Sequence, residues 1–346
     1  MQRSNVAGFM CRTACTRNRA RARSVAAAAL LTLVCFASGC GQGAGAPRSS
    51  GPPRLNGEIL FTMNGRLHLM RPDGTHQRPI PGSPRDVTSA SFSPDGTRIA
   101  FVRELGGSCP ARLYMMWPDG THVRPLTPEV NDPVMEADCI EHPAWSPDGR
   151  WLAFTEDVNL GLPSIFVRNV DGAPPHELPG QSIQRADTNP AWSPDGKTIA
   201  FDSGGSLWLM DADGSNERQL DTGSPPCAGA GEPDWSPDGQ WIAFVRNTCK
   251  PQALPGGGNE HWSDIWLIRP DGSDLRRLTH ADRRAWAAHS PSWSPDGKRI
   301  VFVRLVRRSR YSDFSDIYVM SADGTRQQRL IRFLNYSIAP DWGPRQ

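Results

Sequence analysis

Residues 190–201 read PAWSPDGKTIAF, and residues 206–214 read SLWLMDADG. Short apolar and aromatic runs that end in Asp-Gly turns are typical of antiparallel strands joined by tight hairpins. In the first turn, Pro194 fixes one backbone torsion, Asp195 can bond to its own backbone, and Gly196 accepts a positive φ. Together with the Arg-Gln-Leu run that follows, this stretch predicts a unit of four antiparallel strands.

Both blocks recur along the chain. The block of an aromatic residue followed by Ser-Pro-Asp-Gly begins at Phe92, Trp145, Trp192, Trp235 and Trp293, with a worn copy at Trp342. The apolar run that ends in Asp-Gly lies at Leu67–Gly74, Leu113–Gly120, Ile165–Gly172, Leu207–Gly214, Ile265–Gly272 and Ile317–Gly324. Because the two blocks alternate six times, the sequence predicts an all-β fold, a six-bladed β-propeller with four antiparallel strands per blade.

The two ends of the repeat predict how the ring closes. The first copy, from Leu55, has a second, third and fourth strand but no aromatic first strand. The run Ala339–Trp342 is a first strand with no blade after it. We expect the two to share one blade, because closure leaves no sheet edge exposed. The propeller is therefore predicted over residues 55–346.

The repeated pattern P-x-W-S-P-D-G-x-x-I-A-F, followed by I/L-W-x-M-x-x-D-G and R-x-L-T, resembles the TolB-like (WD40-like) propeller repeat. The resemblance covers roughly residues 55–344. It implies a propeller used as a binding scaffold in the cell envelope. It also leads us to expect that the chain lacks the separate α/β domain that precedes the propeller in TolB.

The N-terminal segment is typical of an export signal. Arginines between Arg3 and Arg23 precede an apolar run, Val25–Ala37, that is too short to span a bilayer. Small residues before Cys40 resemble a lipobox, whose cysteine carries lipid, although Ala37 stands where leucine is usual. A signal peptide cleaved nearby without lipid is the alternative.

These features predict the domain organisation and the location. Residues 1–39 are expected to be a lipoprotein-type signal peptide. Residues 40–54 are rich in Gly, Ala, Ser and Pro and are expected to be a flexible tether. The protein is then exported and held at the cell envelope, periplasmic or at the outer surface, by a lipid anchor only. We expect it to be a monomer.

The composition narrows the classes of partner. The 346 residues include 33 Gly, 32 Pro, 12 Trp and 12 Phe, which favours a turn-rich fold over disorder. The formal net charge is only +2, so composition gives no reason to expect nucleic acid. No cofactor is expected.

Strand alternation assigns the loops to two faces. Both Asp-Gly turns of each blade fall on one face. The long and dissimilar segments fall on the other face, and binding usually resides in such variable loops. They are 103–112, 127–141, 156–163, 180–188, 222–231, 246–263, 280–289 and 304–315.

Apart from Cys40, four cysteines follow the signal, all in these long segments. In an exported chain an even number favours disulfides over metal ligands. Cys109 and Cys139 belong to one blade, whereas Cys227 and Cys249 flank another. We therefore predict the pairs Cys109–Cys139 and Cys227–Cys249.

The sequence offers little indication of catalysis. The chain carries neither G-x-S-x-G nor H-E-x-x-H, so an enzyme is the less favoured interpretation. The residues that begin the inner strands are Ser89, His142, Asn189, Glu232, Ser290 and Ala339. Of these, His142, Asn189 and Glu232 belong to consecutive blades and could meet at one channel mouth. They would bind a ligand or partner there, or simply form a solvated lining.

Two further residues are candidates for surface contacts. The tryptophans of the repeat are predicted to be core, but Trp262 and Trp286 fall in long segments. The leading hypothesis is a non-catalytic envelope scaffold that binds an envelope protein or a peptidoglycan-associated partner through its long-loop face. The first alternative is an envelope hydrolase or lactonase with a metal in the channel mouth. The second is sugar or small-ligand sensing through these two tryptophans.

Overall fold

The computed structural model gives the propeller in enough detail to place its blades and their side chains. The described residues are 57–105, 111–127, 139–157, 162–172, 174–179, 184–221, 229–250, 260–281, 286–309, 312–332 and 337–344. All belong to one compact unit, Ser49–Gln346. None of the described segments forms a helix with the length and apolar character needed to cross a bilayer. The predicted signal peptide, the tether and Cys40 lie outside the described residues.

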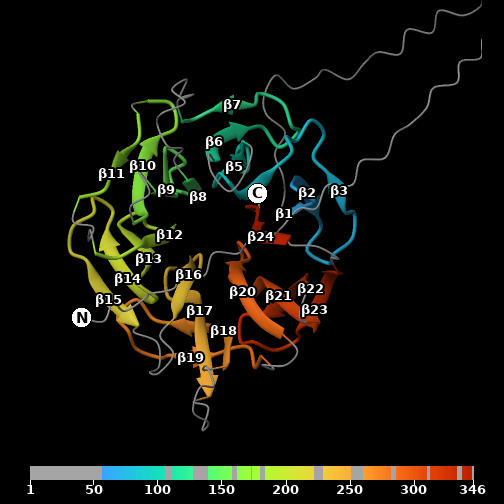
Figure 1. The fold of residues 1–346 in the computed structure, drawn as a ribbon, viewed down its shortest axis with the longest axis vertical. Helices are drawn as coiled ribbons and strands as arrows, with labels where there is room; N and C mark the ends of the chain where they lie inside the picture. Colours follow the sequence, from blue (N-terminus) through green and yellow to red (C-terminus); the bar gives the residue numbers. More distant parts are fainter. Residues whose placement is uncertain are drawn as a thin grey trace, which may run out of the picture. The chain divides into compact units, whose positions relative to one another are not determined.

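The described residues form six sheets of four antiparallel strands, as predicted (Figure 1). The first and second blades comprise β24 (Ser337–Trp342), β1 (Ile59–Met63), β2 (Arg66–Met70) and β3 (Arg78–Pro79), then β4 (Val87–Phe92), β5 (Ile99–Glu104), β6 (Ala111–Met116) and β7 (Arg124–Pro125). The third and fourth comprise β8 (Cys139–Trp145), β9 (Trp151–Asp157), β10 (Ser164–Asn169) and β11 (His176–Glu177), then β12 (Asp187–Trp192), β13 (Thr198–Ser203), β14 (Ser206–Asp211) and β15 (Arg218–Asp221). The fifth and sixth comprise β16 (Ala230–Trp235), β17 (Ile242–Lys250), β18 (Glu260–Ile268) and β19 (Arg276–Arg277), then β20 (Trp286–Trp293), β21 (Arg299–Ser309), β22 (Ser312–Ser321) and β23 (Gln328–Arg332).

The ring closes in the way the sequence predicts. In the first blade the C-terminal strand β24 pairs with β1, with Ile59 opposite Trp342. The indole nitrogen of Trp342 also donates to the Gly57 carbonyl oxygen, at 3.0 Å. The inner strands β24, β8, β12, β16 and β20 surround the axis, and the short fourth strands form the rim (Figure 1).

The core is divided among the junctions between consecutive blades. Each of six apolar clusters draws its residues from two neighbouring blades. The second strand of every blade contributes a fully buried phenylalanine: Phe61, Phe101, Phe154, Phe201, Phe244 and Phe302. The inner-strand tryptophans are buried as predicted, except Trp192, which is partly exposed.

The Asp-Gly turns owe their form to local hydrogen bonds. In the first turn of the second blade, Ser93 Oγ donates to Asp95 Oδ1 at 2.6 Å, and the Arg98 amide donates to Ser93 Oγ at 2.9 Å. In the outer turn of the fourth blade, the Ser215 amide donates to Asp213 Oδ1 at 2.9 Å. These bonds engage one carboxylate oxygen of each aspartate within its own turn, which supports a structural role of the aspartates in the turns.

Two of the predicted loops are largely strand. Most of segment 304–315 belongs to the hairpin of β21 and β22, and both ends of segment 246–263 extend β17 and β18. The prediction was wrong there because these two hairpins continue beyond the repeated blocks from which the strands were predicted. A strand tolerates charge on one side when its other side is apolar, as Val303 and Leu305 show in β21.

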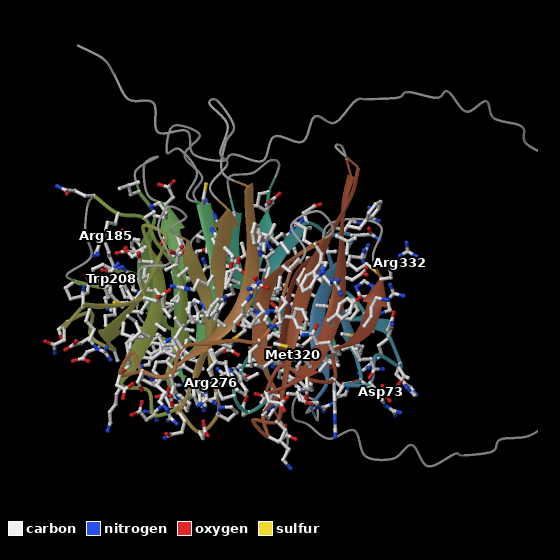
Figure 2. The ribbon with its side chains drawn as sticks, turned by 90° about the horizontal axis from the view of Figure 1, so that it is seen from below. Asp73, Arg185, Trp208, Arg276, Met320 and Arg332 are labelled. Carbon is white, nitrogen blue, oxygen red and sulfur yellow. The ribbon has the colours of Figure 1, made fainter. Side chains whose placement is uncertain are left out.

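Side chains at the two ends of the ring can be told apart (Figure 2). Asp73 and Arg276 lie toward the end that carries the Asp-Gly turns, which we name the turn face. Arg185 and Arg332 lie toward the opposite end, where the inner strands begin, which we name the loop face.

Candidate binding site in the central channel

Six residues, one from each inner strand, line a single cavity of about 570 Å³ along the channel. We name them the mouth residues: Ser89, His142, Asn189, Glu232, Ser290 and Ala339. The structure thus brings together the predicted trio of His142, Asn189 and Glu232. His289, Val303 and Leu305 also line the cavity.

A bulge in the inner strand turns the mouth residues away from regular pairing. The pairing register shifts between Glu141 and Ala144 in the third blade, and four other inner strands shift at the same place. In β4 the shift comes before Ser89, which pairs with Val102. His142, Asn189, Glu232 and Ser290 have φ between 49° and 54°, a conformation that costs non-glycine residues energy. Each precedes a proline, which a bulge accommodates because the unpaired residue needs no ladder hydrogen bond.

The bulge leaves backbone amides that the neighbouring blade must satisfy. The His142 amide donates to Ser89 Oγ at 3.3 Å, and the Asn189 amide donates to Thr155 Oγ1 at 3.2 Å. The Ser290 amide donates to Glu232 Oε2 at 2.6 Å. The side chains of Ser89, Thr155 and Glu232 thus link neighbouring blades, and that of Glu232 is charged.

Glu232 is joined to two side chains in a hydrogen-bonded series. Its Oε1 lies 3.3 Å from His289 Nδ1, and the Nε2 of that ring lies 3.0 Å from Ser263 Oγ. The side chains of His289 and Glu232 are about one third exposed, at 34% and 32%. Both ring nitrogens thus face an acceptor, an arrangement that suits a protonated imidazole.

The pKa values follow from this pairing. Burial would raise the pKa of Glu232, but the charge and hydrogen bond of His289, the Ser290 amide and the charge of His142 lower it to about 2. Burial would lower the pKa of His289, but the charge and hydrogen bond of Glu232 raise it overall. The two form an ion pair at the channel wall.

The pKa values of other carboxyl groups near the channel are raised. Burial and the charge of Asp341 raise the pKa of Asp234 to about 7, although the hydrogen bond from the Trp293 amide lowers it. Burial also raises the pKa of Asp341 to about 6, although it accepts a hydrogen bond from the Phe92 amide. In β13, burial and the charge of Glu232 raise the pKa of Asp202 to about 7 despite a Gly205 amide hydrogen bond.

The Ser263–His289–Glu232 series has the residue types of a hydrolytic triad, but its geometry favours a positioning role. A nucleophilic serine must reach the substrate, and its histidine must accept a proton. Ser263 is only 3% exposed, and the raised pKa of His289 favours the protonated ring. The series therefore fixes the imidazole at the cavity wall.

A metal centre finds little support in the same cavity. Both oxygens of Glu232 are engaged by His289 and Ser290. Within the described ranges there is no group of three or more His, Cys, Asp or Glu placed to hold a metal ion.

Trp262 and Trp286 do not lie in loops as predicted. They belong to β18 and β20 and are partly buried. Trp286 packs on the core cluster between the fifth and sixth blades, and the Arg304 guanidinium lies 3.7 Å from its ring centroid. A strand continuing past the predicted loop boundary explains the difference.

The disulfide predictions are tested at one cysteine. Cys139 begins β8 and is disulfide-bonded. Cys109 and Cys227 lie outside the described residues, and the side chain of Cys249 is not described. Both predicted pairings therefore stay predictions.

The sequence analysis missed His289, Asp234 and Asp341 as channel groups. His289 directly precedes a mouth residue, and the two aspartates lie two positions after one. Aligning the six inner strands would have placed all three in the channel wall.

Comparison with known proteins supports the fold. No protein-family model matches the sequence. The Tol-Pal system protein TolB of Nitratidesulfovibrio vulgaris is 41% identical over 70 residues, 20% of this chain and 14% of that protein. The chain therefore aligns with only a small part of that relative's length.

Solved structures extend the likeness to the whole ring. TolB of Acinetobacter baumannii superposes with a TM-score of 0.61 and 21% identity, over 83% of this chain and 67% of that one. A TolB candidate from Agrobacterium tumefaciens gives a TM-score of 0.58 and 20% identity, over 84% and 99%. The predicted TolB-like character of the propeller is confirmed by these likenesses.

Proposed function

We propose that this TolB-like propeller is a non-catalytic scaffold of the cell envelope, which binds a segment of an envelope protein or of a peptidoglycan-associated partner at the mouth of its channel. Export and anchoring through Cys40 are part of the proposal and rest on the sequence of residues 1–40. The N. vulgaris relative is a Tol-Pal system protein, which supports an envelope role.

The convergence of the mouth residues carries the proposal. The framework repeats nearly the same side chains in every blade, whereas the six mouth positions hold Ser, His, Asn, Glu, Ser and Ala. Diversity at structurally equivalent positions around one cavity is expected of a surface adapted to a particular ligand. The cavity offers an ion pair, amide and hydroxyl groups, and the apolar side chains of Val303 and Leu305. A polypeptide segment presents complementary groups of all these kinds.

The hydrolase alternative has one observation in its favour, the Ser263–His289–Glu232 series. It requires Ser263 to become accessible, and the metal version requires ligands that the cavity does not offer among its described residues. Loss of a hydrolytic activity on changing Ser263→Ala, with partner binding intact, would favour this alternative.

The test is to fill the mouth with a larger side chain. Ala339 lies in β24 and lines the cavity. In tagged protein crosslinked in intact cells, Ala339→Trp should reduce recovery of the partner about tenfold or more, as expected when a central contact is blocked. Recovery is measured by quantitative mass spectrometry of the purified adducts.

Lys298→Trp is the matched control, because Lys298 is exposed in a turn of the turn face. It introduces the same tryptophan side chain away from the mouth and should leave recovery unchanged. Equal recovery from wild type and Ala339→Trp would contradict the proposal, as would a wild-type sample that yields no specific partner.

A further inference from the structure

The six blade junctions provide an internal comparison on the turn face. At each junction on the turn face, two positions of one blade can be compared with the equivalent positions of the other blades. One position lies at the start of the second strand, and the other lies in the fourth strand. We name them the second-strand position and the fourth-strand position.

At the junction of the second and third blades, both positions are arginine. The Arg98 guanidinium lies 4.8 Å from the Trp145 ring centroid and donates to the Gly149 carbonyl oxygen at 2.7 Å. Arg98 and Arg124 both pair with Asp171, at 3.7 and 2.9 Å. An aromatic face, a carbonyl oxygen and a carboxylate thus surround one guanidinium.

The next junction has the equivalent aromatic ring, carbonyl oxygen and carboxylate, but it lacks the two arginines. Trp192, Gly196 and Asp213 stand where Trp145, Gly149 and Asp171 stand in the preceding junction. Trp151 occupies the second-strand position and His176 the fourth-strand position. Their rings meet edge to face, with centroids 6.4 Å apart.

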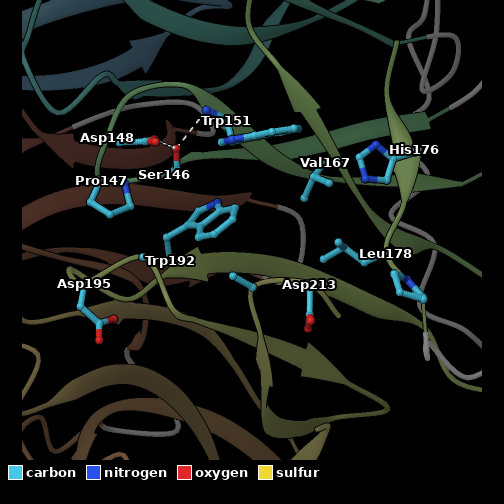
Figure 3. A pocket seen from close by; sticks show the side chains of 13 residues that line it. Ser146, Pro147, Asp148, Trp151, Val167, His176, Leu178, Trp192, Asp195 and Asp213 are labelled. Atoms are coloured by element: carbon cyan, nitrogen blue, oxygen red, sulfur yellow. Dashed lines mark hydrogen bonds between the residues drawn. The ribbon is translucent and has the colours of Figure 1, made fainter. Parts of the chain in front are cut away.

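A groove of about 520 Å³ lies at this junction (Figure 3). Trp192, Val167 and Leu178 form apolar walls, and Trp151 is 36% exposed. The carboxyl groups of Asp148, Asp195 and Asp213 also line the groove.

The other junctions keep at least one arginine of their own. The second-strand positions, in blade order, are Glu58, Arg98, Trp151, Thr198, Trp241 and Arg299. The fourth-strand positions are Arg78, Arg124, His176, Arg218, Arg276 and Gln328. Arg299 lies 4.8 Å from the ring centroid of Trp342 in the next blade, whereas Arg276 lies 4.5 Å from that of Trp241 in its own blade. Only the junction of the third and fourth blades has arginine at neither position.

The groove also carries negative charge that its own wall does not neutralise. Hydrogen bonds from the Ser146, Ser193 and Ser215 hydroxyls are the main cause of the lowered pKa values of Asp148, Asp195 and Asp213. All three are therefore ionised at neutral pH. Among the described residues, the one cation within ion-pair distance of these carboxylates is Lys197, 3.9 Å from Asp195 and largely exposed.

We infer that this groove receives the side chain of an arginine presented by a partner polypeptide, which takes the place of the internal arginine found at the other junctions. A planar, delocalised guanidinium can stack on an indole while it donates to a carbonyl and a carboxylate. A lysine ammonium has no planar face for that stack. The site lies on the turn face and does not depend on the proposed use of the channel mouth.

The test uses the purified full-length protein and the capped peptide Gly-Arg-Gly, followed by the NMR signals of the tryptophan indole groups. Gly-Arg-Gly should shift the Trp151 and Trp192 signals in a saturable way. The peptides with citrulline, which is neutral and of similar shape, and with lysine should bind at least about tenfold more weakly. Equal binding of the citrulline peptide would overturn the inference.

Trp151→Arg restores an internal arginine and should abolish Gly-Arg-Gly binding. Thr198→Arg introduces an arginine at the equivalent position of the next junction and should leave Gly-Arg-Gly binding unchanged. Asp213→Asn, a milder change, should weaken binding several-fold and keeps the test decisive if Trp151→Arg does not fold. Wild-type affinity in both Trp151→Arg and Asp213→Asn would contradict the inference.

Discussion

Aspartates at the turn face and in the channel of the same ring have opposite properties. On the turn face, Asp95 accepts hydrogen bonds from Ser93 Oγ at 2.6 Å and from the Thr97 amide at 3.1 Å. Burial would raise its pKa, but these bonds lower it. In the channel, Asp234 accepts a hydrogen bond from the Trp293 amide at 2.6 Å, yet burial and the charge of Asp341 raise its pKa to about 7.

The difference separates aspartates that the turns share from aspartates that only two blades carry. The turn aspartates recur from blade to blade, remain charged and complete a local backbone structure. Asp234 and Asp341 are confined to two blades, and their raised pKa values bring their change of charge close to neutral pH. Each accepts a backbone amide hydrogen bond from a neighbouring blade, so each also links two blades.

The largest expected effect follows from removing a channel charge. A carboxyl whose pKa is higher in the folded than in the unfolded protein binds more protons when folded, so stability falls as pH rises. For Asp234 this window runs from about pH 4 to about pH 7. Asp234→Asn should therefore raise the free energy of unfolding at pH 8 by roughly 2 kcal/mol and flatten this pH dependence. Urea unfolding between pH 4 and 8 measures both, and a variant less stable than wild type at pH 8 would contradict the account.

A turn aspartate should behave in the opposite sense. Because the pKa of Asp95 is lowered in the folded protein, its contribution is present above the unfolded value near 3.8 and is lost as the pH falls. Asp95→Ala should cost about 1 kcal/mol at pH 7 through lost turn hydrogen bonds, and less at pH 3. Unfolding curves at the two pH values provide the measurement. A cost that does not depend on pH would show that the carboxylate charge has no part in the turn.

The smallest effect is expected at the ion pair. Glu232→Gln removes the charge that raises the pKa of His289, so that pKa should fall. The pair stabilises the fold below the ordinary histidine pKa of 6.5, and this contribution is lost as pH rises through the raised value. The imidazole NMR signals of His289 report the change. Glu217→Gln, which alters the remote pair with Arg185, is the control and should leave His289 unaffected.

The sequence was sufficient for features that repeat. Six copies of one turn motif determined the blade number, and the unpaired blocks at the two ends determined closure through β24 and β1. Equivalent positions in the inner strands also predicted that His142, Asn189 and Glu232 would meet, because ring symmetry brings equivalent positions to one channel.

The sequence was insufficient where a feature depends on partners from different blades. Trp286 was predicted to lie in a loop, because nothing local indicated that Arg304 would cover its ring in an extended hairpin. The pairing of His289 with Glu232 joins two blades and appears only when they are packed. The groove at Trp192 lies where the junction lacks the arginines found at other junctions. A search for sequence motifs does not detect the absence of a residue.

The central claim, that the channel mouth is the docking surface, is tested most directly by photocrosslinking in intact cells. A photoreactive amino acid is placed at Ala339 in the mouth and, in a second strain, at Lys298 on the turn face. The account predicts a discrete adduct with an envelope polypeptide from position 339 and none from position 298. An adduct from position 298 with none from position 339 would contradict it.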